Sequence, residues 1–405
     1  MIGRALIAGS IAVALAGATA DAAAPDPAER AEALLGGAAI DRFVAKQLPS
    51  TFAVRGDRDA GVGAQDVTLV DARSCGAAGK EAPGRGRFIG VVRPADAGAA
   101  ALPALERHDC RAKPDDVARR LAAAPAAGAV AVVELVVEWV PSELRVSIGD
   151  VAAAGEGGRA LGRTLARAKG AGPLATADTS GLRLETARGS SLTLDVALSF
   201  LKGGEGVVAT LTPSCAGCVP APARAPFITQ AAAPADSDGA AGATLAFANR
   251  IVALFSADGP LELAVDRETV EIRNVQISGG DGTLAVRGRA TARTVGESAQ
   301  VRLDSAGSDL RLGDVQATAE LEDCRALSGA ASLRCSVRNG ARGPAAAALA
   351  AAMASRYRGQ LLRTLVAPPP FSFEVGGRRV TLRLTPTRAS AAAGTVVVHG
   401  KADFE

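Results

Sequence analysis

The side chains most often used in catalysis are scarce in this chain. Two histidines are present, His108 and His399, and they stand in unrelated sequence contexts. A histidine-based triad needs a nucleophile and an orienting group, and a metal cluster needs several ligands at suitable spacing. Neither pattern surrounds these histidines, and the alternation around His399 predicts that it faces solvent. We therefore expect a protein that is not an enzyme, with no catalytic residue, no metal site and no cofactor.

Six cysteines are the other reactive side chains. An even number favours disulfides in an oxidising compartment. Sequence neighbours suggest three pairs: Cys75 with Cys110, Cys215 with Cys218, and Cys324 with Cys335. The last pair flanks a turn-rich stretch between two strand-like runs, while other connectivities remain open. The middle pair has the spacing of a redox motif, but the prolines around it leave no helix to activate a thiol, so a structural disulfide is the better interpretation.

The N-terminus has the three parts of an export signal. Arg4 gives a basic start, residues 5–17 are apolar, and Ala18-Thr19-Ala20 is a cleavage site of small residues. The alternative is a membrane anchor, but the apolar run is shorter than the ~20 residues that span a bilayer. We expect residues 1–20 to be a cleaved signal peptide and the mature protein to be periplasmic or secreted.

Composition argues against nucleic-acid binding. The 45 basic and 42 acidic residues nearly cancel, and aromatic residues make up 3% of the 405. Neither a basic field nor aromatic stacking platforms for nucleotides are therefore expected. One basic helix is predicted, in which Arg159, Arg163 and Arg167 share a face. That face is either solvated surface or a membrane-surface helix.

An internal repeat organises the second half of the chain. The segment PLELAVDRETVEIR from Pro260 aligns with PFSFEVGGRRVTLR from Pro370 without a gap over 14 positions. The match resumes at residues 282–288 and 394–400. Both copies alternate apolar and polar residues with a period of two, which predicts antiparallel strands with one buried face. Two more degenerate copies are predicted in the N-terminal half.

Helical sequence precedes each copy. In the later copy, an apolar stripe recurs every four residues: Leu349, Met353, Tyr357, Leu361 and Leu365. It predicts an amphipathic helix that Pro344 starts and the prolines at 368–370 end. We therefore predict an α+β fold, with repeated units of one long amphipathic helix packed on a curved antiparallel sheet, in two tandem modules.

The predicted boundaries follow composition. Residues 213–243 are rich in Pro, Ala, Gly and Ser and are predicted to be a linker or long loop. Residues 21–212 would then form an N-terminal helix-plus-sheet module. Residues 244–405 would form a C-terminal module with two repeats.

This helix-then-sheet unit, used in tandem in an exported chain, resembles the tubular lipid-binding superfamily, which includes bactericidal permeability-increasing-like proteins and bacterial periplasmic relatives. The resemblance rests on residues 245–288 and 349–400. It implies an elongated module that shields a lipid or another apolar ligand between helix and sheet. The implied ligand-binding residues are Ile251, Phe255, Leu261, Leu263, Leu361, Leu365, Phe371 and Phe373.

Two functions therefore stay open. The first is binding or transport of a lipid or other apolar small molecule. The second is a structural or assembly role in the cell envelope, in which exposed sheet edges bind a protein partner. The pattern leaves open whether the interior is a cavity or a filled core, because both use the same aliphatic residues.

Overall fold

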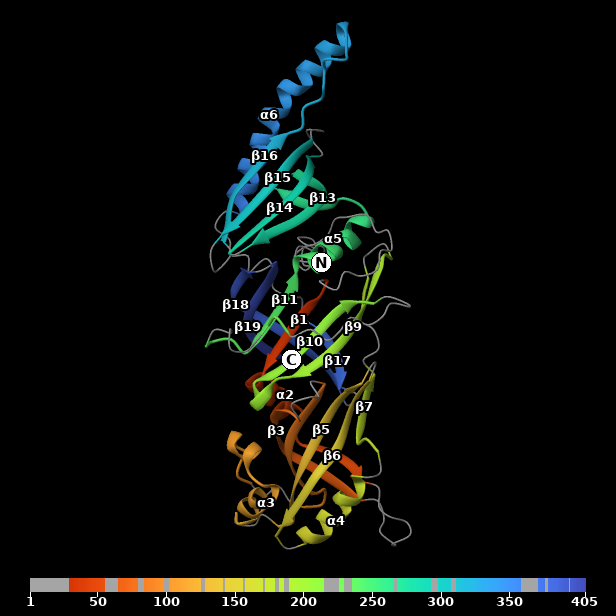
Figure 1. Cartoon of the computed structure of the whole chain (residues 1–405), viewed down its shortest axis with the longest axis vertical. Helices are drawn as coiled ribbons and strands as arrows, with labels where there is room; N and C mark the ends of the chain where they lie inside the picture. Colours follow the sequence, from red (N-terminus) through yellow and green to blue (C-terminus); the bar gives the residue numbers. More distant parts are fainter. Residues whose placement is uncertain are drawn as a thin grey trace.

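The computed structural model describes most of the chain. The described residues are 29–54, 65–78, 84–97, 102–124, 128–140, 143–155, 157–169, 172–178, 182–185, 189–214, 226–228, 235–265, 268–280, 282–292, 298–306, 311–357, 371–375, 378–392 and 394–405. Figure 1 shows an elongated molecule with α3 and α4 near one end and α6 at the other. The predicted signal peptide, residues 1–20, lies outside the described residues.

Three antiparallel sheets form the body of the molecule. The central sheet consists, in order, of β17 (Phe371–Val375), β18 (Arg378–Ala392), β19 (Thr395–Phe404), β11 (Gly239–Thr244), β1 (Ala31–Gly36), β10 (Gly206–Pro213), β9 (Ser191–Phe200) and β8 (Leu182–Glu185). A six-stranded sheet contains β2 (Ser50–Val54), β3 (Gln65–Ala77), β4 (Arg85–Pro94), β5 (Val130–Val140), β6 (Glu143–Ala154) and β7 (Ala175–Asp178). A five-stranded sheet contains β12 (Leu261–Val265), β13 (Glu268–Gly280), β14 (Thr283–Ala292), β15 (Ser298–Ala306) and β16 (Arg311–Ala319).

The helices of the described chain are α2 (Gly37–Gln47), α3 (Pro114–Ala122), α4 (Gly158–Ala168), α5 (Leu245–Ala257) and α6 (Gly329–Tyr357), with 3-10 turns η1 (Arg107–Arg111) and η2 (Lys202–Gly204). α2, α5 and α6 each lead from one sheet to another, whereas α3 and α4 connect strands of the six-stranded sheet. Among the described residues, no helix is both long enough and apolar enough to cross a membrane.

The two halves of the chain use the same order of elements. β1 and β11 are antiparallel neighbours at the middle of the central sheet. Two similar halves related by a twofold axis would meet in this way. On one side follow β10, β9 and β8, and on the other β19, β18 and β17. In each half the first strand leads directly into a helix, α2 or α5, and then into the strands of one outer sheet. Both halves therefore contribute to one continuous central sheet (Figure 1).

The aligned sequence segments form matching hairpins. In the first, Leu261 is paired with Ile272 and Leu263 with Val270. In the second, Phe371 is paired with Leu382 and Phe373 with Val380. The pairings coincide position by position because the alternation of apolar residues fixes the register of a strand with one buried face.

The range predicted as a linker contributes to the core. It includes the central strand β11, and Ile228 within it is buried. Glu32 of β1, 1% exposed, accepts hydrogen bonds from the backbone N–H groups of Phe227 and Ile228 at 2.8 and 3.0 Å. A buried carboxylate with these partners fixes residues 226–228 against β1.

The predicted fold class is wrong. The described chain has 19 strands, and α2 to α5 have only 9 to 13 residues, so the fold is mainly β and not a set of long helices on sheets. The exception, α6, has 29 residues but begins at Gly329, and Pro344 lies inside it. An internal proline costs about 3 kcal/mol. Contacts that Cys335, Asn339 and Arg342 make before Pro344 hold the earlier turns helical.

The six-stranded sheet has apolar residues on both faces. Val117 and Leu121 of α3 pack on one face with Val130 and Val132 of β5. Leu161 and Leu165 of α4 pack on the other face, in a cluster with Ala131 and Val133 of β5. A strand covered on both sides has a nearly continuous apolar sequence, as β5 does.

Candidate functional site

Two of the implied ligand-binding residues lie on α5, between sheets. Ile251 is 5% exposed and packs in a cluster with Phe247 and with Leu194 of β9. Phe255 is partly buried against the same cluster and against a second one formed with the β13–β14 and β18–β19 hairpins. The interior around these two residues is thus occupied by side chains of the protein itself.

Four of the other implied residues lie on strands. Leu261 and Leu263 occupy β12, and Phe371 and Phe373 occupy β17; only their backbone positions are described. These strands are edge strands of two different sheets. Leu361 and Leu365 lie outside the described residues.

The described part of the chain contains two disulfides. Cys75 of β3 is joined to Cys110 of η1, and Cys324 is joined to Cys335 of α6. These are two of the three pairs suggested by sequence neighbours, while Cys215 and Cys218 lie outside the described residues. Disulfides fit an extracellular or periplasmic protein, because such compartments are oxidising.

The two histidines lie in different surroundings. His108 has an exposed side chain, and its Nδ1 is 3.2 Å from Glu106 Oε2. The prediction that His399 faces solvent is wrong: it is 6% exposed in β19, and its Nδ1 has no hydrogen-bond partner among the described residues. Val398, His399 and Gly400 are consecutive and all buried, so both faces of β19 are covered at this point and the alternation no longer separates core from solvent. No group of three or more metal-ligand residues occurs in the described part of the chain.

Burial of His399 predicts a pH-dependent stability. Desolvation and then the nearby Arg388 charge lower the pKa of His399 below its ordinary value of 6.5. The folded state therefore favours the neutral imidazole. The resulting contribution to the free energy of unfolding is fully present above pH 6.5 and is lost as the pH falls below that value. Urea unfolding between pH 8 and pH 5 should show a decline in stability that is smaller in His399→Gln. A decline in His399→Gln equal to that of the natural chain would contradict the assignment.

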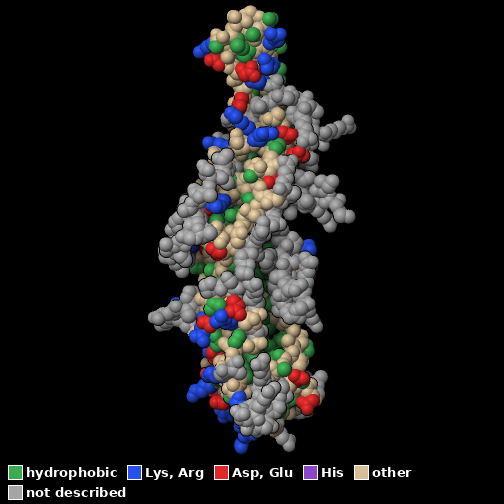
Figure 2. Space-filling model, turned by 90° about the vertical axis from the view of Figure 1, so that its right-hand side faces the viewer, with side chains coloured by type: hydrophobic (Ala, Val, Ile, Leu, Met, Phe, Trp, Pro, Cys, Tyr) green, Lys and Arg blue, Asp and Glu red, His purple; other side chains and the backbone are tan. Residues whose placement is uncertain are grey.

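Large apolar side chains are exposed in the first turns of α6 and in the loop that precedes this helix. Leu321, Leu327, Leu333 and Val337 are 65, 43, 68 and 66% exposed; we call them the apolar tip. Leu333 and Val337 are one helical turn apart and share a face. In Figure 1 this segment extends beyond the five-stranded sheet, and Figure 2 shows hydrophobic and charged side chains together at the upper end.

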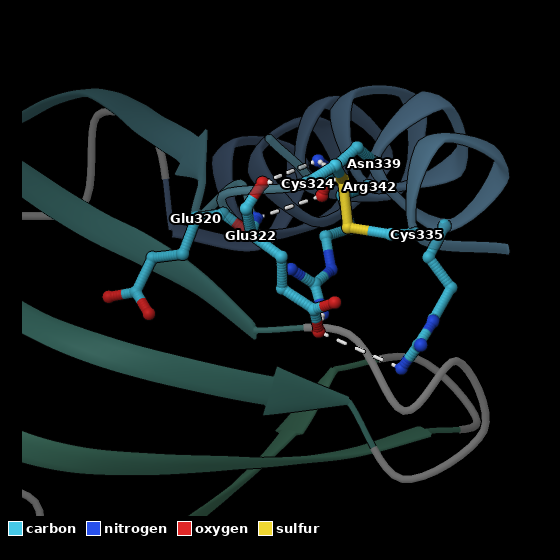
Figure 3. A network of polar contacts seen from close by, with 7 residues as sticks. Glu320, Glu322, Cys324, Cys335, Asn339 and Arg342 are labelled. Carbon is cyan, nitrogen blue, oxygen red and sulfur yellow. Dashed lines mark hydrogen bonds and ion pairs between the residues drawn. A yellow bond between two sulfur atoms is a disulfide. The ribbon is translucent and has the colours of Figure 1, made fainter. Parts of the chain in front are cut away.

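The loop that carries part of the tip is fixed to α6 (Figure 3). Asn339 accepts a hydrogen bond from the backbone N–H of Glu322 and donates one to its carbonyl, both at 2.9 Å. Arg342 donates to the Glu320 carbonyl at 2.8 Å and to Glu322 Oε1 at 2.7 Å. The Cys324–Cys335 disulfide adds a covalent link. Because the loop is held at successive residues, its leucines are exposed by a defined structure and not by a loose end.

Arginines surround the apolar tip. Arg325 and Arg334 are exposed, and no carboxylate pairs with either guanidinium among the described residues. Arg338 is 3.7 Å from Glu322, whose other partner is Arg342 at 2.7 Å. The tip thus combines apolar side chains with cations that are free to meet an anionic surface.

The sequence pattern does not predict this site. It indicates a turn at residues 325–332 between two strands, whereas the second element is helix α6. The available signal was Leu333 and Val337 at helical spacing among arginines. The predicted basic face of α4 is exposed at Arg159, Arg163 and Arg167, opposite buried Leu161 and Leu165.

Comparisons with known proteins assign no family. No family model and no curated protein matches the chain. The solved structure of P47 of Clostridium botulinum E1 is similar with a TM-score of 0.33 and 6% identity, covering 92% of this chain and 99% of that one. A lipopolysaccharide binding protein is similar with a TM-score of 0.30 and 8% identity, covering 95% of this chain and 100% of that one. Both scores are low, so neither similarity assigns a ligand to this chain.

Proposed function

We propose that this chain is an exported, non-enzymatic lipid-binding protein that meets lipid assemblies through its apolar tip. The observation that carries the proposal is the exposure of Leu321, Leu327, Leu333 and Val337 on a disulfide-bonded frame. The packed surroundings of Ile251 and Phe255 favour this surface over the interior beside α5 as the place of lipid contact.

The energetics of transfer support a lipid partner. Moving one exposed Leu or Val side chain from water into apolar surroundings is worth about 1.5–3 kcal/mol. Cations beside an anionic lipid surface add about 1 kcal/mol each. Arg325 and Arg334 provide such cations around the tip. A periplasmic or secreted location is part of the proposal, and the two disulfides support it.

Vesicle flotation of the full mature chain tests this function. We expect binding to phosphatidylcholine vesicles that contain phosphatidylglycerol, and weaker binding to phosphatidylcholine alone. In about 1 M salt the charge contribution should be screened while the apolar contribution remains. If the protein binds neither type of vesicle at low salt, the proposal is wrong, and a protein partner becomes the better explanation of the exposed tip.

A further inference from the structure

A pocket lined by arginines lies where η1 meets β3 and β4. Its walls include Arg87 of β4, Arg107, His108 and Arg111 of η1, and the Cys75–Cys110 disulfide, around a volume of about 470 Å³. We call it the arginine pocket. It lies far along the chain from the apolar tip and is formed by different elements, so it is not part of the surface proposed above.

The charges of the arginine pocket have one sign. No carboxylate is among its lining residues in the described chain. The neighbouring acids are otherwise engaged: Glu106 lies 3.2 Å from His108, and the buried Asp109 pairs with Arg120 at 2.6 Å. Arg107 and Arg111 have exposed side chains, and no ion pair holds either one among the described residues.

Arg87 adds a third guanidinium, which is held by two contacts. Its Nη2 donates to the Cys110 carbonyl at 2.5 Å, and its Nη1 is 3.8 Å from Glu134 Oε2. A guanidinium has five N–H donors, so further donors remain after these contacts. Arg87 therefore links β4 to η1, and its remaining N–H groups can still bind a negatively charged ligand.

The backbone that carries these arginines is held in place. The Cys75–Cys110 disulfide attaches η1 to β3, and the Leu105 N–H donates to Asp71 Oδ2 at 2.7 Å. A rigid frame lowers the ordering cost of binding. Free guanidinium groups on such a frame are suited to oxyanions, which they bind through paired N–H groups.

An adjoining pocket extends the site toward α2. It has a volume of about 530 Å³ and includes Arg107, which therefore borders both pockets. Its lining is of mixed charge: Asp238 is paired with Arg42 at 2.6 Å, and Glu205 and Asp236 also face it. When the anionic group of a ligand binds among the arginines, this adjoining pocket has room for the polar rest of the same molecule.

We propose that the arginine pocket binds a phosphate-bearing ligand through Arg87, Arg107 and Arg111. The pocket is larger than phosphate alone needs, so the phosphate is one end of a larger molecule. That molecule is either a soluble phosphate ester or the headgroup of a phospholipid. The two share the same chemistry at the arginines and differ in whether the rest of the ligand is in solution or in a bilayer.

The test uses the double variant Arg107→Gln, Arg111→Gln, because both side chains are exposed and their loss leaves the frame intact. The matched control is Arg159→Gln, Arg163→Gln on α4, which removes the same charge from another exposed surface. Calorimetry with glycerol 3-phosphate should give binding to the natural chain and to the control. Loss of two charge-assisted contacts should weaken binding by the pocket variant about tenfold or more.

The lipid source is examined by flotation with phosphatidic acid in phosphatidylcholine vesicles. A pocket-variant defect seen only with these vesicles assigns the pocket to a lipid headgroup, and a defect with glycerol 3-phosphate assigns it to a soluble ester. Equal losses in pocket variant and control, or no binding of either probe by the natural chain, would overturn the proposal. Because glycerol 3-phosphate needs no membrane, its result is independent of the apolar tip.

Discussion

The double variant Leu333→Ser, Val337→Ser is expected to bind anionic vesicles about 100-fold more weakly than the natural chain, because two aliphatic transfers of at least about 1.5 kcal/mol each are lost. Both side chains are two-thirds exposed, so their replacement removes little internal packing. The measurement is the lipid concentration that gives half-maximal flotation.

Serine also lowers helix propensity slightly, so a matched control is needed. Ala347→Ser, Ala348→Ser changes two exposed positions of the same helix outside the tip. It should leave vesicle binding unchanged. Equal binding by the tip variant and the natural chain would show that the exposed leucines do not enter lipid, and an equal loss in the control would point to the helix as a whole.

Removal of the Cys75–Cys110 disulfide has the second large expected effect. The bond closes a sequence separation of 35 residues, for which the loss of unfolded-state entropy corresponds to about 3–4 kcal/mol. Cys75 is 8% exposed and lies in the cluster with Leu105 and Val117. The variant Cys75→Ser, Cys110→Ser should therefore unfold at a clearly lower urea concentration.

The second disulfide supplies the comparison. Cys324 and Cys335 are separated by 11 residues, so the same entropic relation gives an effect about 1 kcal/mol smaller. The bond also lies in the exposed tip segment and not in a sheet core. We expect Cys324→Ser, Cys335→Ser to lower stability less than the first variant. The reverse order would show that the tip, and not the six-stranded sheet, limits unfolding.

Local patterns were sufficient for some parts of the structure. The alternation in residues 260–288 and 370–400 predicted strands, and the two hairpins pair in the same register. Sequence neighbours suggested the two disulfides that are present. In each case, the interacting residues are close in sequence or share a simple period.

The candidate sites could not be predicted in this way. The apolar tip depends on α6 starting at Gly329 and extending past the five-stranded sheet. The arginine pocket depends on η1 lying beside β3 and β4, which precede it in the chain. Whether a side chain is exposed, and which charges from separate elements lie side by side, depends on the assembled surface. The periodic patterns of the sequence do not contain this information.

The sequence by itself determined the strand-rich hairpins of the repeat and the scarcity of histidine, and it suggested the two cysteine pairs that the described residues form. Only the tertiary structure decided that β1 pairs with β11, that His399 is buried, and that Pro344 lies within a helix. The physical reason is the range of the interactions. Hairpin register follows from adjacent residues, whereas the central sheet joins strands about 200 residues apart, whose pairing depends on the free energy of the whole fold.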